Sequence, residues 1–469
     1  MYEKIRKLHF VGIGGIGMSG IAEVLINLGY RVSGSDLTDN ASVQRLRRMG
    51  ATIHLGHREE NVLDVDVVVH SSAVTPNNPE LLAARRQRIP IARRAEMLAE
   101  LMRIKYGIAI AGTHGKTTTT SMVATLLGKA GMDPTVVNGG IVKAFDSNAR
   151  LGHGDFMVTE ADESDGSFLK LFPIIAVVTN MDPEHLDHYG TFDAVRQAFM
   201  SFVEKIPFYG LAVLCQDHPE VAAMVPRLSD KRVITYGLRE GADYQAVAIR
   251  REEERTRFRV MRRDPVSGLS TPLGEVGLAL PGQHNVSNAL AAIAVAMELE
   301  IPWAVIDQAL DQYKGVRRRF DLLLNTPERV IIDDYAHHPT EIAATLQGAR
   351  EGFGSQRRLV AIFQPHRYSR VHSLWSSFLR CFRGADLVLV DQIHPAGEAP
   401  LADISPAAMR SQLLAGIQAE SGIPTHPLPD GDLLEHGQGE LEELLQPGDI
   451  VVFLGAGSIT KKARNFAGT

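Results

Sequence analysis

The segment between residues 105 and 131 places an apolar run, a glycine turn and a helix-forming stretch in direct succession. Ile108–Ala111 is long enough for one buried strand, and Gly112–Gly115 then turns the chain. Lys116 and Thr117 open the next stretch, whose apolar positions suit a helix. A strand, a tight turn and a helix N-terminus in this order form a typical binding site for a nucleotide phosphate.

The turn departs from the usual phosphate-binding pattern at one position. That pattern has a glycine five residues before Gly115, whereas this chain has Ile110 there. The alternative is an ordinary glycine turn, which would leave Lys116 without a purpose. We expect Lys116 to add a positive charge and Thr117 to place its hydroxyl on Mg²⁺. The predicted nucleotide-binding residues are Gly112, Thr113, His114, Gly115, Lys116, Thr117 and Thr118.

Length and composition describe a soluble chain of several domains. A length of 469 residues suggests about three domains, and 45% hydrophobic residues fit sizeable cores. The net charge of −6 argues against a general nucleic-acid or membrane-surface partner. Cys215 and Cys381 are far apart and give no metal spacing, which favours a reducing, cytoplasmic location. No run is long and apolar enough to span a membrane.

A second candidate phosphate site lies between residues 7 and 36. The strand-forming run Leu8–Val11 is followed by Gly12, Gly14 and Gly17 in a G-x-G-x-x-G pattern, and a second strand then ends at Asp36. This order predicts a dinucleotide-type βαβ unit with an acid placed for a ribose hydroxyl. It fixes a fold and an anion site, but both NAD and a UDP-sugar would satisfy it.

Polar residues follow several further predicted strands. His70 and Ser71 come after the strand at residues 65–69, at the edge where open α/β sheets bind ligands, although a capping turn is the alternative. Glu160 ends a strand at residues 156–159 and is a predicted Mg²⁺ ligand; His185 is a softer candidate for a second metal position. Other acids of these loops are equally compatible with a solvated surface, namely Asp162, Glu163, Asp165, Glu184 and Asp187.

The remaining sequence predicts an α/β fold of three domains, each with a mainly parallel sheet. We expect an N-terminal Rossmann-like domain over residues 1–104, a central P-loop ATPase-like domain over 105–314 and a C-terminal Rossmann-like domain over 315–469. His284, Asn285 and Asn288 fall within one turn before an alanine-rich helix, and suit a base, a positioning role or helix capping. Arg367 and Arg370 are three residues apart and could share a helical face toward an anion.

Motifs in all three predicted domains resemble the Mur ligases, the ATP-dependent amino-acid ligases of peptidoglycan precursor synthesis. The resemblance spans nearly the whole chain. It implies that ATP phosphorylates the lactyl carboxylate of UDP-N-acetylmuramate and that the amine of L-alanine attacks the acyl phosphate. The motifs that carry it are HFVGIGGIGMSGIAEVL, HSSAV, GTHGKTTTT, TEADESDGS, TNMDPEHLDHYG, PGQHNVSNALAA, VRRRFD, DDYAHHPTE and FQPHRYSR.

The same resemblance implies roles for particular residues. Lys116, His185 and Arg319 would be catalytic, and Thr117, Glu160 and His185 would bind Mg²⁺. Asn285 and Asn288 would hold adenine with His284 beside them, and Arg319 and Asp334 would close over the ATP; the adjacent Arg317 and Arg318 leave that choice open. The UDP-sugar would contact Gly14, Gly15, Gly17, Ser19, Asp36, His70 and Ser71. The amino-acid carboxylate and the lactyl end would meet His337, His366, Arg367 and Arg370.

One departure from the family and three rival interpretations remain open. Several Mur ligases carry a carbamylated lysine on the helix after the EHLD segment, whereas residues 193–202 of this chain contain no lysine. The rivals are a nicotinamide-dependent oxidoreductase, a sibling ligase that attaches a preformed peptide to UDP-N-acetylmuramate, and a non-catalytic UDP-sugar sensor. We expect a monomer or weak homodimer.

Overall fold

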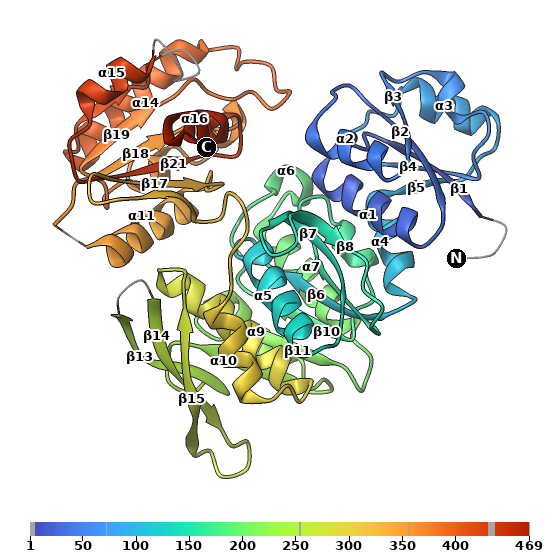
Figure 1. Cartoon of the computed structure of the whole chain (residues 1–469), viewed down its shortest axis with the longest axis horizontal. Coiled ribbons are helices and arrows are strands. Elements are labelled where there is room, and N and C mark those ends of the chain that lie inside the picture. The colour runs from blue at the N-terminus through green and yellow to red at the C-terminus, as the bar shows by residue number, and fades with distance from the viewer. Residues whose placement is uncertain (1–4, 72, 253–254, 355, 430–436, 469) are drawn as a thin grey trace. The chain divides into compact units, whose positions relative to one another are not determined.

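The computed structural model describes residues 5–71, 73–252, 255–354, 356–429 and 437–468 (Figure 1). The chain divides into two compact units. The first unit comprises residues 1–249, 258–277 and 287–314, and the second comprises residues 250–257, 278–286 and 315–469. Two of the three sheets belong essentially to the first unit and the third belongs to the second. The predicted three-sheet α/β fold is confirmed.

The first sheet is a fully parallel five-stranded sheet in the order β3-β2-β1-β4-β5. This is the Rossmann-like order that the glycine pattern predicts. A helix-forming pattern runs through residues 91–104, but its first three residues, Ile91–Arg93, form a strand that extends the sheet beside β4. Its strands are β1 (Lys7–Val11), β2 (Arg31–Asp36), β3 (Thr52–Leu55), β4 (Val67–His70) and β5 (Ile91–Arg93), and its helices are α1 (Ile16–Asn27), α2 (Ala41–Arg48), α3 (Pro79–Arg86) and α4 (Arg94–Met102).

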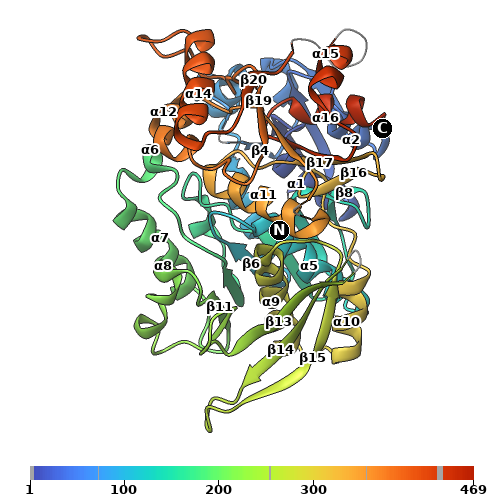
Figure 2. The ribbon, with the colours of Figure 1, turned by 90° about the vertical axis from the view of Figure 1, so that its left-hand side faces the viewer.

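The second sheet has ten strands in the order β15-β14-β13-β12-β11-β10-β6-β9-β7-β8. Its parallel centre places β6 between β9 and β10, and β13 to β15 form a ribbon at one edge (Figure 2). The strands are β6 (Tyr106–Ala111), β7 (Thr135–Val142), β8 (Ser147–Arg150), β9 (Phe156–Glu160), β10 (Ile175–Val178), β11 (Leu211–Cys215), β12 (Val233–Gly237), β13 (Tyr244–Glu252), β14 (Arg255–Arg263) and β15 (Ser270–Leu278). The helices that follow or connect them are α5 (Lys116–Lys129), α6 (Leu186–Tyr189), α7 (Phe192–Glu204), α8 (Pro219–Ala222), α9 (Gln283–Glu298) and α10 (Trp303–Asp311).

The third sheet has six strands in the order β16-β17-β21-β18-β19-β20, and only β16 runs antiparallel to its neighbour. The strands are β16 (Asp321–Asn325), β17 (Arg329–Asp334), β18 (Leu359–Phe363), β19 (Leu387–Val390), β20 (Thr425–Pro427) and β21 (Asp449–Leu454). The helices are α11 (Pro339–Phe353), α12 (Tyr368–Ser373), α13 (Trp375–Phe378), α14 (Pro406–Ser421), α15 (Gly437–Leu444) and α16 (Ile459–Ala467).

The central strands are buried on both faces, which fixes the edges where side chains reach solvent. Ile108–Ala111 of β6 and Leu359–Phe363 of β18 are fully buried apolar runs. Because helices cover both faces of such strands, polar side chains gather where the strands end. No helix within the described ranges is long and apolar enough to cross a membrane.

Candidate active site

The turn between β6 and α5 requires glycine at both of its ends. Gly112 and Gly115 have φ angles of +134° and +82°, in the region that side chains rarely adopt. A β-carbon on Gly112 would lie 2.0 Å from the Thr179 hydroxyl oxygen, and one on Gly115 would lie 2.6 Å from the Asn288 amide oxygen. The two glycines therefore let the turn pack closely between β10 and α9.

Residues that follow β10 hold this turn in place. The Asn180 side chain accepts a hydrogen bond from the His114 N–H (2.7 Å) and donates to the His114 carbonyl (3.0 Å). The Thr179 hydroxyl also donates to that carbonyl, at 2.6 Å. Because the His114 N–H is used in this way, the N–H groups best placed for a phosphate are those at the start of α5, where a helix has no internal partners for them.

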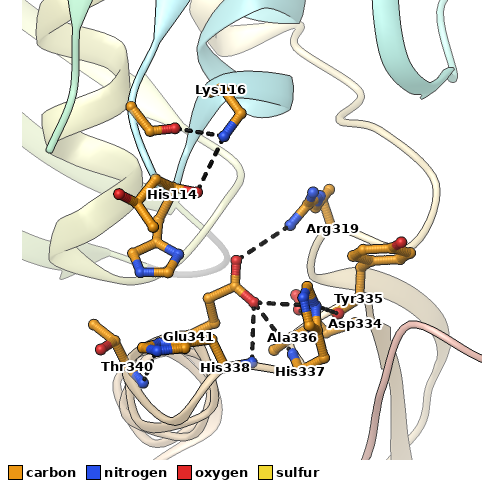
Figure 3. A network of polar contacts seen from close by, with 12 residues as sticks. His114, Lys116, Arg319, Asp334, Tyr335, Ala336, His337, His338, Thr340 and Glu341 are labelled. Carbon is orange, nitrogen blue, oxygen red and sulfur yellow. Dashed lines mark hydrogen bonds and ion pairs between the residues drawn. The ribbon is translucent and has the colours of Figure 1, made fainter. Parts of the chain in front are cut away.

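Lys116, labelled in Figure 3, is the first residue of α5. It forms a buried ion pair with Glu163. Its ammonium lies 3.0 and 2.9 Å from the two Glu163 carboxylate oxygens and also donates to the carbonyls of Gly112 and Thr113. Burial alone would lower the pKa of Lys116, but the charge of Glu163, followed by that of Asp162, outweighs burial and raises it. The cation therefore stays charged at the phosphate turn.

Asp182 contacts the same turn through both its carboxylate and its backbone N–H. Its carboxylate lies 3.0 Å from His114 Nε2 and 3.4 Å from His218 Nε2, and its backbone N–H donates to the Thr113 hydroxyl at 2.9 Å. Hydrogen bonds from His114 and then His218 hold the pKa of Asp182 well below its usual range. Sequence reasoning missed these contacts and that of Glu163, because an acidic loop shows no sign of which carboxylates turn inward.

The predicted metal ligands supply the hard oxygen donors that Mg²⁺ prefers. Glu160 ends β9 and accepts a hydrogen bond from the Gly139 N–H at 2.6 Å, while the Thr117 hydroxyl is buried at the start of α5. His185 is the residue before α6 and has a φ of +56°; its Nε2 atom lies 3.7 Å from the Glu184 carboxylate. No group of three His, Cys, Asp or Glu within the described ranges forms a metal cage, so Mg²⁺ here would draw further ligands from phosphate and water. The side chain of Asp187 lies outside the described part.

Helix α9 begins at Gln283, so both predicted adenine contacts lie inside the helix rather than at its cap. Asn288 is buried against Gly115 and accepts a hydrogen bond from the Thr119 hydroxyl at 3.2 Å. Asn285 donates to the Pro281 carbonyl at 2.7 Å. Burial lowers the pKa of His284 to about 4, so its imidazole is neutral at neutral pH.

The N-terminal glycine turn is held by the acid that was predicted to contact a ribose. Asp36 accepts hydrogen bonds from the N–H groups of Gly14 (2.8 Å) and Thr38 (3.0 Å). Gly15 is the residue before α1, and no side chain caps this helix. The other predicted UDP-sugar contacts make local bonds: the Ser19 hydroxyl donates to the Ile16 carbonyl, and the His70 ring bonds the Ser71 carbonyl.

In the second unit the adjacent Arg318 and Arg319 are not equivalent. Arg318 donates to the carbonyls of Gly455 (2.7 Å) and Gly457 (3.2 Å) and is committed to the fold. Arg319 lies 4.0 Å from the Glu341 carboxylate (Figure 3). Both guanidinium groups lie over the Tyr335 ring, at 4.7 Å from its centre for Arg318 and 5.0 Å for Arg319. Because the Arg318 guanidinium is bonded to backbone carbonyls, we keep Arg319 as the candidate for a nucleotide phosphate.

Asp334 holds the backbone that carries Arg319. Its two carboxylate oxygens accept hydrogen bonds from the N–H groups of Phe320 (2.6 Å) and Ala336 (2.7 Å). Burial raises the pKa of Asp334 to about 6. The contacts on both oxygens give Asp334 a part in positioning the arginine, alongside the nucleotide contact that the sequence predicts.

Histidines and arginines gather at the carboxyl ends of β17, β18 and β19. The His366 ring stacks on His394 with 5.3 Å between centroids, and His337 lies edge-on to His366 at 5.9 Å. Arg370 lies 3.3 Å from His366 Nδ1. Burial, then the charges of His337 and Arg370, lower the pKa of His366 to about 3. Arg367 precedes α12 with a φ of +69° and faces Glu398, so the predicted shared helical face with Arg370 is wrong.

A lysine-bearing phosphate turn with carboxylates on neighbouring strands defines an α/β enzyme that uses a nucleotide triphosphate. Comparison with protein-family models narrows that class. Residues 7–106 match the Mur ligase family, catalytic domain; residues 110–296 match the Mur ligase middle domain; and residues 318–457 match the Mur ligase, glutamate ligase domain. The chain belongs to the Mur ligase family.

Individual relatives cover the chain from end to end. It is 60% identical to a UDP-N-acetylmuramate–L-alanine ligase of Magnetococcus marinus, over 100% of this chain and 98% of the relative. It is 54% identical to the protein of that name from a Bradyrhizobium species, over 98% of this chain and 97% of the relative. The crystal structure of a UDP-N-acetylmuramate-alanine ligase from Thermotoga maritima matches with a TM-score of 0.81 and 31% identity, covering 98% of each chain.

Proposed function

We propose that this protein joins L-alanine to the lactyl carboxylate of UDP-N-acetylmuramate at the expense of ATP, as part of peptidoglycan precursor synthesis. The observation that supports it most is the full-length similarity to relatives named for this reaction, combined with a charged lysine at the phosphate turn. The substrates are small molecules, and we propose a cytoplasmic protein, either a monomer or a weak homodimer, with no nucleic-acid or membrane partner.

A carboxylate does not accept an amine until it is activated, and this requirement sets the order of steps. The lactyl carboxylate oxygen attacks the γ-phosphorus of ATP and ADP leaves, which gives an acyl phosphate. The amine of L-alanine then attacks the carbonyl carbon, and the tetrahedral intermediate expels phosphate while the nitrogen loses its protons. Such transfers depend mainly on positioning and on stabilising charge.

The charges of the first unit suit the phosphoryl transfer. Lys116 holds its ammonium at the start of α5, and Asn180 and Asp182 keep the turn in one shape around it. We assign the ATP phosphates to this turn, Mg²⁺ to Thr117 and Glu160, and a second Mg²⁺ to His185. Bound Mg²⁺ would supply positive charge to the transferring phosphoryl group. The N-terminal glycine turn is assigned to the UDP-sugar, and Asn285 and Asn288 to adenine.

The second unit offers groups for the amino acid. Arg370 and the neutral imidazole of His366 lie side by side at the carboxyl end of β18, and a guanidinium is the group that best matches a carboxylate. We assign the carboxylate of L-alanine and the lactyl end to His337, His366, Arg367 and Arg370. Arg319, positioned by Asp334, is assigned to ATP.

The experiment is release of inorganic phosphate from ATP and Mg²⁺ in the presence of UDP-N-acetylmuramate. L-alanine, glycine, L-serine and an L-alanine-containing tripeptide are offered in turn as the amine. The proposal predicts the fastest release with L-alanine. Release with the tripeptide alone would make the protein a peptide ligase, and NADH oxidation without phosphate release would make it an oxidoreductase.

A further inference from the structure

Arg94 connects the N-terminal glycine turn to the acidic loop beside Lys116. It is the first residue of α4, and its guanidinium lies against the first turn of α1: a β-carbon on Gly17 would be 2.8 Å from Arg94 Nη1. The other terminal nitrogen donates to Asp162 at 3.0 Å. One cation therefore touches both the predicted UDP-sugar turn and the loop that carries Glu163.

A positive charge at this point needs an anion beside it. The N-terminal end of a helix carries partial positive charge, so a guanidinium against the first turn of α1 is unfavourable on its own. This first turn contains no acidic residue and no side chain caps it. Asp162 supplies one negative charge, and its other carboxylate oxygen accepts the Ser164 N–H at 3.1 Å. The arrangement is poised for an anionic ligand.

The Arg94–Asp162 pair is accessible and is not the main link between the two sheets of the first unit. The two side chains are 24% and 39% exposed. Other contacts join the same parts: Asn148 donates to the Ile16 carbonyl, Ser147 donates to Glu23 at 3.1 Å, and Lys170 pairs with Glu96. The pair is partly buried and is one of several contacts that join these parts, so the fold does not depend on Arg94 alone.

We propose that Arg94 binds the pyrophosphate of the UDP-sugar and exchanges Asp162 for it when that substrate enters. The proposal rests on the proposed function and extends it by one residue that the glycine pattern does not include. A guanidinium suits a pyrophosphate because its planar donors bond two phosphate oxygens at once. Substrate binding would then release Asp162 from its ion pair within the loop next to Lys116.

The test is calorimetric binding of UDP-N-acetylmuramate without ATP or L-alanine. Arg94→Ala is expected to weaken binding at least tenfold, and Arg94→Lys to weaken it less. Asp162→Asn removes the competing carboxylate, so it is expected to leave binding unchanged or to tighten it up to fivefold. Arg93→Ala, which changes the exposed neighbouring arginine, is the matched control and should bind like the wild type.

Opposite effects of the two substitutions separate ligand binding from a structural ion pair. If Arg94→Ala binds within twofold of the wild type, or Asp162→Asn weakens binding as much as Arg94→Ala does, the inference is overturned. Thermal unfolding of each variant verifies that it is folded.

A second nucleotide sugar identifies the anionic group. UDP-N-acetylglucosamine carries the pyrophosphate but no lactyl carboxylate, so Arg94→Ala should weaken its binding by the same factor. A loss confined to UDP-N-acetylmuramate would assign Arg94 to the carboxylate and overturn the pyrophosphate assignment. If the wild type binds neither sugar nucleotide, the proposed function fails as well. If the wild type binds and Arg94→Ala binds with the same affinity, this inference fails alone.

Discussion

Replacing Glu163 with glutamine would leave the buried charge of Lys116 without its main partner. The carboxylate is 3% exposed and both of its oxygens lie within 3.0 Å of the Lys116 ammonium, whose side chain is 16% exposed. Removing one partner of a buried ion pair costs about 3–5 kcal/mol of the free energy of unfolding. The carbonyls of Gly112 and Thr113 still accept from Lys116, so we expect a loss of about 3 kcal/mol, at the lower end of that range.

Urea unfolding followed by circular dichroism measures this loss directly. Glu204→Gln, at an exposed position near the end of α7, is the matched control and should change stability by less than about 0.5 kcal/mol. The double variant Glu163→Gln with Lys116→Met no longer contains the unpaired ammonium. Its loss in the free energy of unfolding should therefore be at least about 1 kcal/mol smaller than the sum of the losses in the two single variants. A loss below about 1 kcal/mol for Glu163→Gln, or full additivity, would refute the buried ion pair.

Three further predictions concern the phosphate turn and the imidazole of His284. Lys116→Met should lower kcat for phosphate release by about 10²–10³ or more, and near-normal turnover would contradict its role. Gly112→Ala should destabilise the fold by about 2–4 kcal/mol in urea, since its β-carbon meets Thr179, whereas Gly128→Ala in open space on α5 should be neutral or stabilising. Burial lowers the pKa of His284 to about 4, whereas the pKa of histidine in the unfolded chain is about 6.5. Between these values the unfolded chain binds the proton more readily than the folded protein, so the free energy of unfolding decreases as the pH falls from 6.5 to 4. From pH 7.5 to 5.5 the wild type should therefore lose about 1.3 kcal/mol more than His284→Gln in denaturant titrations, and equal losses would show that the imidazole is not buried.

The fold could be predicted because its signals are local. Ile108–Ala111 is apolar throughout, as a strand buried on both faces must be, and the glycines after it have no alternative in a turn with positive φ. The strand at Ile91–Arg93 escaped prediction because three residues carry too little pattern, and the helix-forming run after them dominates. Its place in the sheet follows from pairing with β4, which is a contact distant in sequence.

The site could be predicted only where a residue type and its position in a motif define the role. Lys116 and Glu160 stand at a helix start and a strand end, which the sequence reveals. Glu163 looks like any acid of a solvated loop, and its pairing with a lysine 47 positions earlier depends on how two loops fold together. Likewise, three consecutive arginines look alike until the carbonyls of Gly455 and Gly457 fix Arg318.

The central claim is that ATP activates the lactyl carboxylate, and isotope transfer tests it most directly. UDP-N-acetylmuramate labelled with ¹⁸O in that carboxylate is converted with ATP, Mg²⁺ and L-alanine, and the released phosphate is analysed by mass spectrometry. Because the acyl phosphate breaks at the carbon–oxygen bond, each phosphate should carry one ¹⁸O atom. Unlabelled phosphate formed together with the amide product would contradict the acyl-phosphate route.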